Sequence, residues 1–150
     1  MDEATIVLRL AVAALVGGLV GLEREMRGKP AGMRTHALVC MGAALFATLS
    51  GSPIDPSYRI ASNVVVGVGF LGAGMILRTA NRVVGLTTAA EVWALAAIGL
   101  AIGLGYYIVT MAGVALLYTV LFPAGIVERK LKQRVLAKEA EAHVLASDEA

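Results

Sequence analysis

The chain has 150 residues, of which 58% are hydrophobic and only 16% are charged, and its formal net charge is +2. Soluble domains are usually about 45–50% apolar and about 25% charged, so this composition argues against an ordinary soluble domain. The single cysteine, Cys40, excludes an intrachain disulfide framework and a cysteine-rich zinc site.

Five apolar runs follow one another along the chain. They cover residues of about 4–22, 35–54, 60–77, 88–105 and 106–127. A helix that crosses a bilayer needs about 20 mainly apolar residues, within a range of roughly 17–25. A soluble helical core would show polar faces at helical spacing, and these runs have almost none. We therefore expect an all-α integral membrane protein, built as a bundle of five transmembrane helices.

The basic residues predict the orientation of these helices. Of the 13 lysines and arginines, all but Arg9 and Arg59 lie after the first run, after the third run or in the C-terminal tail. Lysine and arginine concentrate on the cytoplasmic side of membrane proteins. We therefore expect the N-terminus outside and the C-terminus in the cytoplasm. The start, Met1 to Glu3, is acidic where a cleavable signal is basic, so the first run is expected to stay as an anchor.

The first run combines small residues with one charge. Gly17 and Gly21 form a G-x-x-x-G pattern, which lets helices in a membrane approach closely. Arg9 lies about two turns inside the run, where a charge costs roughly 2.5–3.5 kcal/mol at a helix centre on insertion scales. It either snorkels to the outer surface or makes an inward contact with Asn63 or Asp55, which are expected near the outer side.

A dense group of polar residues follows in the segment GLEREMRGKPAGMRTH, residues 21–36. The predicted cytoplasmic cap consists of Glu23, Arg24, Glu25, Arg34, Thr35 and His36, joined by Arg78, Thr87, Thr88 and Glu91 from the next inner segment. It either ties helix ends together by ion pairs or forms a docking or ligand site. One histidine without a second histidine or cysteine is weak evidence for a transition-metal site. Carboxylates such as Glu23 and Glu25 are able to hold hydrated Mg²⁺, but such sites have no specific sequence pattern.

The third run contains the stretch VVGVGFLGAGMIL, residues 65–77, which matches the dinucleotide-binding pattern G-x-G-x-x-G. That function needs a preceding strand and an acidic residue about 20 positions further on, and neither is expected here. The glycines instead give the helix two small faces, which predicts a helix in the middle of the bundle. The predicted packing glycines are Gly17, Gly21, Gly67, Gly69, Gly72 and Gly74.

The fourth run carries a stripe of alanines and one acidic residue. The stripe, expected to be a partner surface for the glycine-rich runs, consists of Ala90, Ala94, Ala97 and Ala101. Glu91 shares a different stripe with Leu95, Ile98 and Ile102 and lies one turn inside the cytoplasmic end. It either reaches the water at the lipid headgroups or pairs with an arginine at the same level, namely Arg24, Arg78 or Arg82.

The tail, residues 128–150, is basic near the membrane. Val127, Leu131 and Val135 recur at helical spacing with basic residues between them. This pattern fits an amphipathic helix lying on anionic lipid or a simple extension of the fifth helix. The basic stretch is too short to predict nucleic-acid binding.

Three strings make the chain resemble the MgtC/SapB family of bacterial inner-membrane proteins: GLEREMRGKPAGMRTHALVCMGAALF, VVVGVGFLGAGMILR and GLTTAAEVWALAAIGLAIGLG. The resemblance implies a multi-pass protein of the bacterial inner membrane linked to low magnesium, acid stress and survival inside host cells, hence to virulence. The residues that match the family pattern are Glu23, Arg24, Glu25, Pro30, Gly32, Arg34, Thr35, Gly69, Gly72, Gly74, Gly85, Leu86, Thr87 and Thr88. Glu91 departs from it, because a small or uncharged polar residue is expected there.

The functional expectation is a non-enzymatic protein that modulates a partner in the membrane. The resemblance implies partners such as ATP synthase or a transporter, and the alternative is an ion (Mg²⁺) transporter or transport accessory. No nucleophile–base pair is apparent, so no catalytic residue and no cofactor are predicted. Small faces on three runs exceed what five helices need internally, which suggests a homodimer. If the cap is a docking site, Arg24→Ala and Arg34→Ala are expected to fold normally and to lose function.

Overall fold

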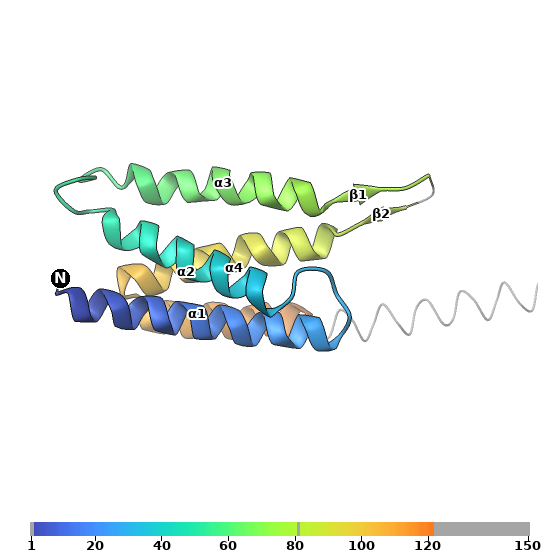
Figure 1. The fold of residues 1–150 in the computed structure, drawn as a ribbon, viewed down its shortest axis with the longest axis horizontal. Coiled ribbons are helices and arrows are strands. Elements are labelled where there is room, and N and C mark those ends of the chain that lie inside the picture. The colour runs from blue at the N-terminus through green and yellow to red at the C-terminus, as the bar shows by residue number, and fades with distance from the viewer. Residues whose placement is uncertain (1, 81, 122–150) are drawn as a thin grey trace, which may run out of the picture. The chain divides into compact units, whose positions relative to one another are not determined.

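The computed structural model describes residues 2–80 and 82–121. Its elements are α1 (Glu3–Met26), α2 (Met33–Leu49), α3 (Arg59–Met75), β1 (Leu77–Arg78), β2 (Val83–Val84), α4 (Leu86–Leu104) and a further helix, Tyr107–Leu121. The labelled helices belong to one compact unit that ends at Val114 (Figure 1). The predicted basic tail lies outside the described residues.

The structure is helical, as the sequence predicts, apart from a minimal antiparallel hairpin formed by β1 and β2. By length and composition, α1 and α4 are able to cross a membrane, whereas α2, α3 and the helix Tyr107–Leu121 are shorter apolar helices. The five-span bundle therefore stays a prediction for these three helices. The second helix ends at Leu49, before the expected residue 54, because the chain turns at Ser50.

Local sequence explains where α1 begins and where α4 ends. Asp2 caps α1: its carboxylate accepts hydrogen bonds from the Thr5 backbone N–H at 3.3 Å and from the Thr5 hydroxyl at 2.6 Å. Such caps satisfy N–H groups that have no partner inside the helix. Gly105 stops α4 with φ of +84°, a conformation that glycine adopts without strain.

The contact between α1 and α2 depends on glycines: Gly17 and Gly21 are packing residues, as predicted, but they face α2 and not the third helix. A Cβ added at Gly17 would lie 2.5 Å from the carbonyl oxygen of His36, and one at Gly21 would lie 2.7 Å from that of Gly32. Real side chains do not approach so closely, so both positions require glycine. The G-x-x-x-G pattern of the first run therefore brings the two backbones together.

A second pair of glycines, Gly99 and Gly103, joins α4 to α2 in the same way. A Cβ at Gly99 would overlap the carbonyl oxygen of Cys40, and one at Gly103 would overlap that of Ala44. Both glycines are buried. The spacing is again G-x-x-x-G, so this contact has a signal in the sequence, which the prediction based on the alanine stripe missed.

The alanine stripe of α4 is not the partner surface, which corrects the sequence-based expectation. Ala90 and Ala97 are exposed, and Ala94 and Ala101 are only half-buried. In a helix that is apolar on every side, small residues occur on the outer face as well as the inner one. The glycine face packs inward because it allows carbonyl groups to come closer than alanine does.

The prediction that the third helix lies in the middle of the bundle is also wrong. A Cβ at Gly67, Gly69 or Gly74 would meet no atom within 4 Å in the described structure, and one at Gly72 would make only an ordinary contact of 3.6 Å with Ala89. In Figure 1, α2 and α4 lie between α1 and α3. Apart from Gly72, the small faces of α3 point away from the bundle.

The buried face of α3 is instead formed by branched side chains. Val64 and Val68 are 8% and 7% exposed, and they pack with Ala43 of α2 and with Val92 and Ala96 of α4. Packing by volume, rather than by close backbone approach, holds α3 to its neighbours. The helix is therefore an outer member of the described bundle.

The turn between α2 and α3 is organised by one buried carboxylate. Asp55 accepts hydrogen bonds from the N–H groups of Arg59 and Ile60, at 3.0 and 2.8 Å, and from the Ser50 hydroxyl at 3.1 Å. Burial acts to raise the pKa of Asp55, but the hydrogen bonds from Ile60, Arg59 and Ser50 and the positive charge of Arg59 outweigh it, so the pKa lies below its ordinary value. Asp55 thus caps the start of α3 in its charged form.

Candidate functional site

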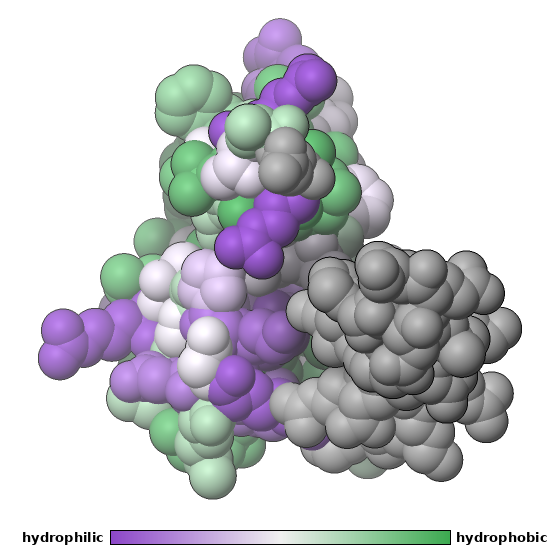
Figure 2. Space-filling model, turned by 90° about the vertical axis from the view of Figure 1, so that its right-hand side faces the viewer, coloured by the Kyte–Doolittle hydropathy of each residue, from purple (hydrophilic) through white to green (hydrophobic). Residues whose placement is uncertain are grey.

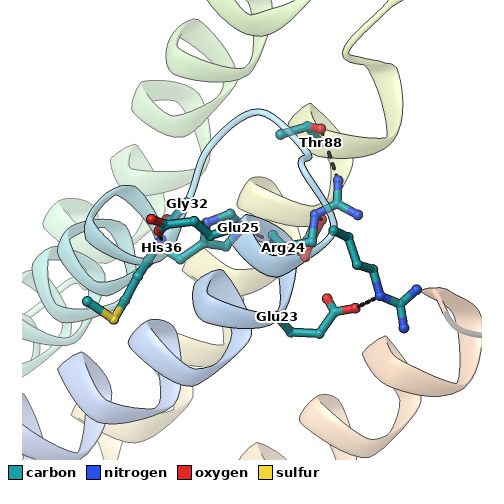
Figure 3. Close-up of polar contacts among 9 residues, drawn as sticks. Glu23, Arg24, Glu25, Gly32, His36 and Thr88 are labelled. Atoms are coloured by element: carbon teal, nitrogen blue, oxygen red, sulfur yellow. Dashed lines mark hydrogen bonds and ion pairs between the residues drawn. The ribbon is translucent and has the colours of Figure 1, made fainter.

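A buried ion pair connects α1 with α4, next to the hydrogen bond between Arg24 and Thr88 that Figure 3 shows. Arg24 lies on the last turn of α1, and its Nε is 2.7 Å from Oε2 of Glu91 on α4. The two side chains are 7% and 0% exposed. A second nitrogen of the guanidinium, Nη2, donates a hydrogen bond of 3.1 Å to the hydroxyl of Thr88, one turn before Glu91. The guanidinium therefore binds two groups on the same face of α4.

His36 adds a third helix to this arrangement. It is fully buried on α2, with Nε2 3.7 Å from Oε1 of Glu91 and Nδ1 3.0 Å from the carbonyl oxygen of Gly32. If Nδ1 carries a proton and donates it to Gly32, the Nε2 atom of a neutral imidazole has only a lone pair to present to Glu91. If the ring is doubly protonated, Nε2 carries a hydrogen that it can donate to Glu91. We refer to Arg24, His36, Thr88 and Glu91 as the buried cluster.

The structure resolves the alternatives for Glu91. Of the three arginines expected at its level, Arg24 is the partner, while Arg78 and Arg82 lie at the exposed hairpin. Glu91 faces inward because Leu95, Ile98 and Ile102, which share its stripe, are all buried. The buried carboxylate of Glu91 is therefore compensated inside the bundle.

Two further carboxylates of the predicted cap have local structural tasks. Oε2 of Glu25 accepts a hydrogen bond of 3.0 Å from the N–H of Met33, the first residue of α2. Because Gly32 has no side chain to cap α2, Glu25 supplies that bond from the neighbouring helix. Glu23 forms an ion pair with Arg27, one turn further along α1.

The remaining members of the predicted cap are exposed. We refer to them as the exposed rim: Arg34, Thr35, Arg78 and Thr87. Figure 2 looks onto this end of the molecule and shows hydrophilic residues gathered between apolar flanks. The predicted cap thus divides into the buried cluster, the two carboxylates with local contacts and the exposed rim.

Arg9 has a partner that the sequence analysis did not find. Its Nη1 donates a hydrogen bond of 2.6 Å to the carbonyl oxygen of Gly103, and its guanidinium lies 6.0 Å from the centre of the Tyr107 ring. The proposed contacts with Asn63 and Asp55 are wrong, because Asn63 is exposed and Asp55 binds the start of α3. A cation at the end of α4 satisfies a carbonyl that has no partner inside the helix. A backbone acceptor leaves no trace in the sequence.

The chemistry available in the buried cluster is that of an ion-pair network. It contains one guanidinium, one carboxylate, one imidazole and one hydroxyl from three helices. Among the described residues, no three histidine, cysteine, aspartate or glutamate side chains converge in a way that would hold a metal ion.

The chain matches one protein family and several named proteins. The model of the MgtC family matches residues 10–130. The chain is 50% identical over 115 residues to the Escherichia coli K12 protein named "Putative magnesium transporter YhiD", covering 69% of this chain and 53% of YhiD. It is 43% identical over 131 residues to "Protein MgtC" of Salmonella typhimurium LT2, covering 86% and 54%.

A third relative comes from Synechococcus elongatus. The chain is 45% identical over 121 residues to "Protein SrpB" of Synechococcus elongatus, covering 70% of this chain and 66% of SrpB. The chain spans about half the length of the YhiD and MgtC proteins that it matches. No solved structure matches the chain.

Proposed function

The chain belongs to the MgtC family, and from this membership we propose that it is a multi-pass protein of the bacterial inner membrane that modulates a partner protein there, under magnesium limitation or acid stress. The observation that carries this proposal is the division of the polar end into the buried cluster and the exposed rim. The buried residues hold α1, α2 and α4 together. The rim residues are exposed in the part of the chain that the structure describes, so they are able to contact another protein.

The exposed surface of the described bundle supports a membrane location. Large apolar side chains point outward on several helices, for example Val66 (74% exposed), Phe70 (82%) and Ile108 (87%). Soluble monomers rarely expose large contiguous apolar patches. In a bilayer, the same side chains contact lipid. The two helices that are long enough to span, α1 and α4, are consistent with this location.

We expect the connection between α1 and α2 to face the cytoplasm and the turn between α2 and α3 to face outward, because basic residues favour the cytoplasmic side. The test introduces one cysteine into each: Lys29→Cys and Ser57→Cys, both at exposed positions. Cys40 is 0% exposed, so the chain without an introduced cysteine is not expected to be labelled. A membrane-impermeant thiol reagent, applied to cells with a permeabilised outer barrier, is expected to label Ser57→Cys only. Labelling of Lys29→Cys alone would show the opposite orientation.

We expect Arg34→Ala and Arg78→Ala to lose function while the protein stays folded. Both are exposed rim residues, and exposed charged groups contribute about 0–1 kcal/mol to stability. The measurement pairs thermal unfolding in detergent with growth in low magnesium of a deletion strain that expresses each variant at a matched level. Arg59→Ala, an exposed arginine at the other end of α3, is the control and is expected to support growth. Full growth support by both rim variants would remove the rim from the function.

Magnesium transport is the second candidate, because the name of the relative YhiD refers to it. In the described bundle, the buried cluster lies at one end and Arg9 lies at the other, and the contact between α2 and α4 is closed by Gly99 and Gly103. A path for an ion through one copy would have to avoid this contact. Magnesium flux into proteoliposomes of the purified chain would favour transport, whereas its absence, together with loss of growth support in the rim variants, would favour modulation.

A further inference from the structure

An apolar groove runs along the outside of the bundle between α1 and α2, with a volume of about 570 Å³. Its lining includes three small residues, Ala14 and Gly18 on α1 and Ala37 on α2. A Cβ at Gly18 would lie 3.8 Å from Cγ of Met33 and 3.9 Å from Cβ of Ala37, both ordinary contacts. Unlike its neighbour Gly17, Gly18 is therefore not required for the two helices to touch. Its effect is to keep the groove open.

The sides of the groove are long apolar side chains. Leu15, Leu19 and Leu22 of α1 line it and are 65%, 57% and 41% exposed. The stretch from Ala14 to Leu22 rises by about 12 Å along the helix axis. One leaflet contributes about half of the roughly 30 Å hydrocarbon core of a bilayer. The groove therefore has the length and the chemistry to hold much of one lipid acyl chain.

A positive charge stands at one end of the groove. Arg34, in the first turn of α2, lines it and is exposed. Within residues 2–80 and 82–121, no carboxylate forms an ion pair with Arg34. Lys29, in the connection between α1 and α2, adds a second exposed basic residue at this end. A guanidinium matches the geometry of a phosphate group and binds it through two parallel hydrogen bonds.

We propose that this groove binds an anionic phospholipid of the cytoplasmic leaflet, with one acyl chain lying along Gly18 and the lipid phosphate bound to Arg34. The inference rests on the membrane location and orientation given under the proposed function. The apolar walls alone do not select between lipids, because lipid tails are as apolar as leucine side chains. Selection comes from Arg34, since a basic residue near the membrane surface favours an anionic headgroup by roughly fivefold.

The test uses the purified chain in nanodiscs that contain equal amounts of phosphatidylglycerol and phosphatidylcholine. Native mass spectrometry after gentle release measures which lipid stays bound. We expect a preference of roughly fivefold for phosphatidylglycerol, which Arg34→Ala abolishes. Gly18→Leu fills the groove and is expected to reduce the bound amount of both lipids. Arg59→Ala, an exposed arginine at the opposite end of the bundle, is expected to keep the preference.

A photoreactive acyl chain on phosphatidylglycerol gives the location of the bound lipid. We expect its crosslinks on peptides that contain Leu15 to Leu22 or Leu38. An unchanged preference in Arg34→Ala together with unchanged binding in Gly18→Leu would overturn the proposal, as would crosslinks confined to other helices. Protein occupying the groove, revealed by efficient disulfide dimers of Leu15→Cys, would also overturn it. A chain that does not enter nanodiscs at all would contradict the proposed membrane location instead.

Discussion

Gly99→Ala is expected to lower the stability of the purified protein strongly, whereas Gly67→Ala is expected to leave it unchanged or slightly raised. Both substitutions add one methyl group to a glycine inside a helix, which by itself favours the helix by about 1 kcal/mol. At Gly67, the methyl group meets open space. At Gly99, it overlaps the Cys40 carbonyl of α2, and overpacking of this kind costs typically about 1–3 kcal/mol and occasionally more.

The atom that the new methyl group at Gly99 would overlap belongs to the backbone, so rotation of a side chain cannot remove the overlap. We therefore expect the loss of stability to lie at or above the upper end of the range of about 1–3 kcal/mol. Gly103→Ala, which meets the Ala44 carbonyl, is expected to behave in the same way. Thermal unfolding in a mild detergent, with equal expression of all variants, measures the difference. Equal melting temperatures for the Gly99 and Gly67 variants would show that α2 and α4 are not in close backbone contact.

Arg24→Leu is expected to destabilise the protein by about 3–5 kcal/mol, because it leaves the buried carboxylate of Glu91 without its cation. Glu91→Leu is expected to be similarly harmful, since it leaves a buried guanidinium. The double variant, Arg24→Leu with Glu91→Leu, is expected to be more stable than either single variant, because replacing a whole buried pair by apolar residues is often neutral or favourable.

A double-mutant cycle in detergent measures this coupling, with Arg34→Leu as a matched control at an exposed arginine. The control is expected to change stability by less than about 1 kcal/mol. Additive effects of Arg24→Leu and Glu91→Leu would contradict the ion pair. This expectation replaces the one from the sequence, in which Arg24 and Arg34 were equivalent members of an exposed cap and both alanine variants folded normally.

The helices could be predicted from the sequence, because hydrophobic runs of this length leave few other structures open to the backbone. Their inward faces were harder to predict. Gly17 and Gly21 form a close contact with α2, whereas Gly67, Gly69 and Gly74 gave the same kind of sequence signal and face away from the bundle. In an apolar helix, composition does not tell the lipid-facing side from the protein-facing side.

The candidate site was predictable in its charges and less so in its geometry. Glu91 had few possible cations at its level, and Arg24 was one of them. For Arg9 the possible partners could not be narrowed down in this way, because its partner is the backbone carbonyl of Gly103, a group that every residue has. Arg24 is buried and Arg34 is exposed because they lie on different helices, at the end of α1 (Met26) and at the start of α2 (Met33), and the sequence alone did not predict which of the two faces inward.

The distance along the chain between Arg24 and its partners on α4 has a consequence for biogenesis. Arg24 and Thr88 are 64 positions apart. At a synthesis rate of roughly 5–20 residues per second, α1 and α2 leave the ribosome several seconds before α4. These two helices can pack together through Gly17 and Gly21 as soon as both have been made. Until α4 follows, the Arg24 guanidinium lacks the Glu91 carboxylate that compensates its charge. Glu91 neutralises the Arg24 guanidinium once α4 joins the other helices, so the α1–α4 ion pair is a late step of assembly, and a chain that stops before Glu91 lacks the carboxylate that pairs with Arg24.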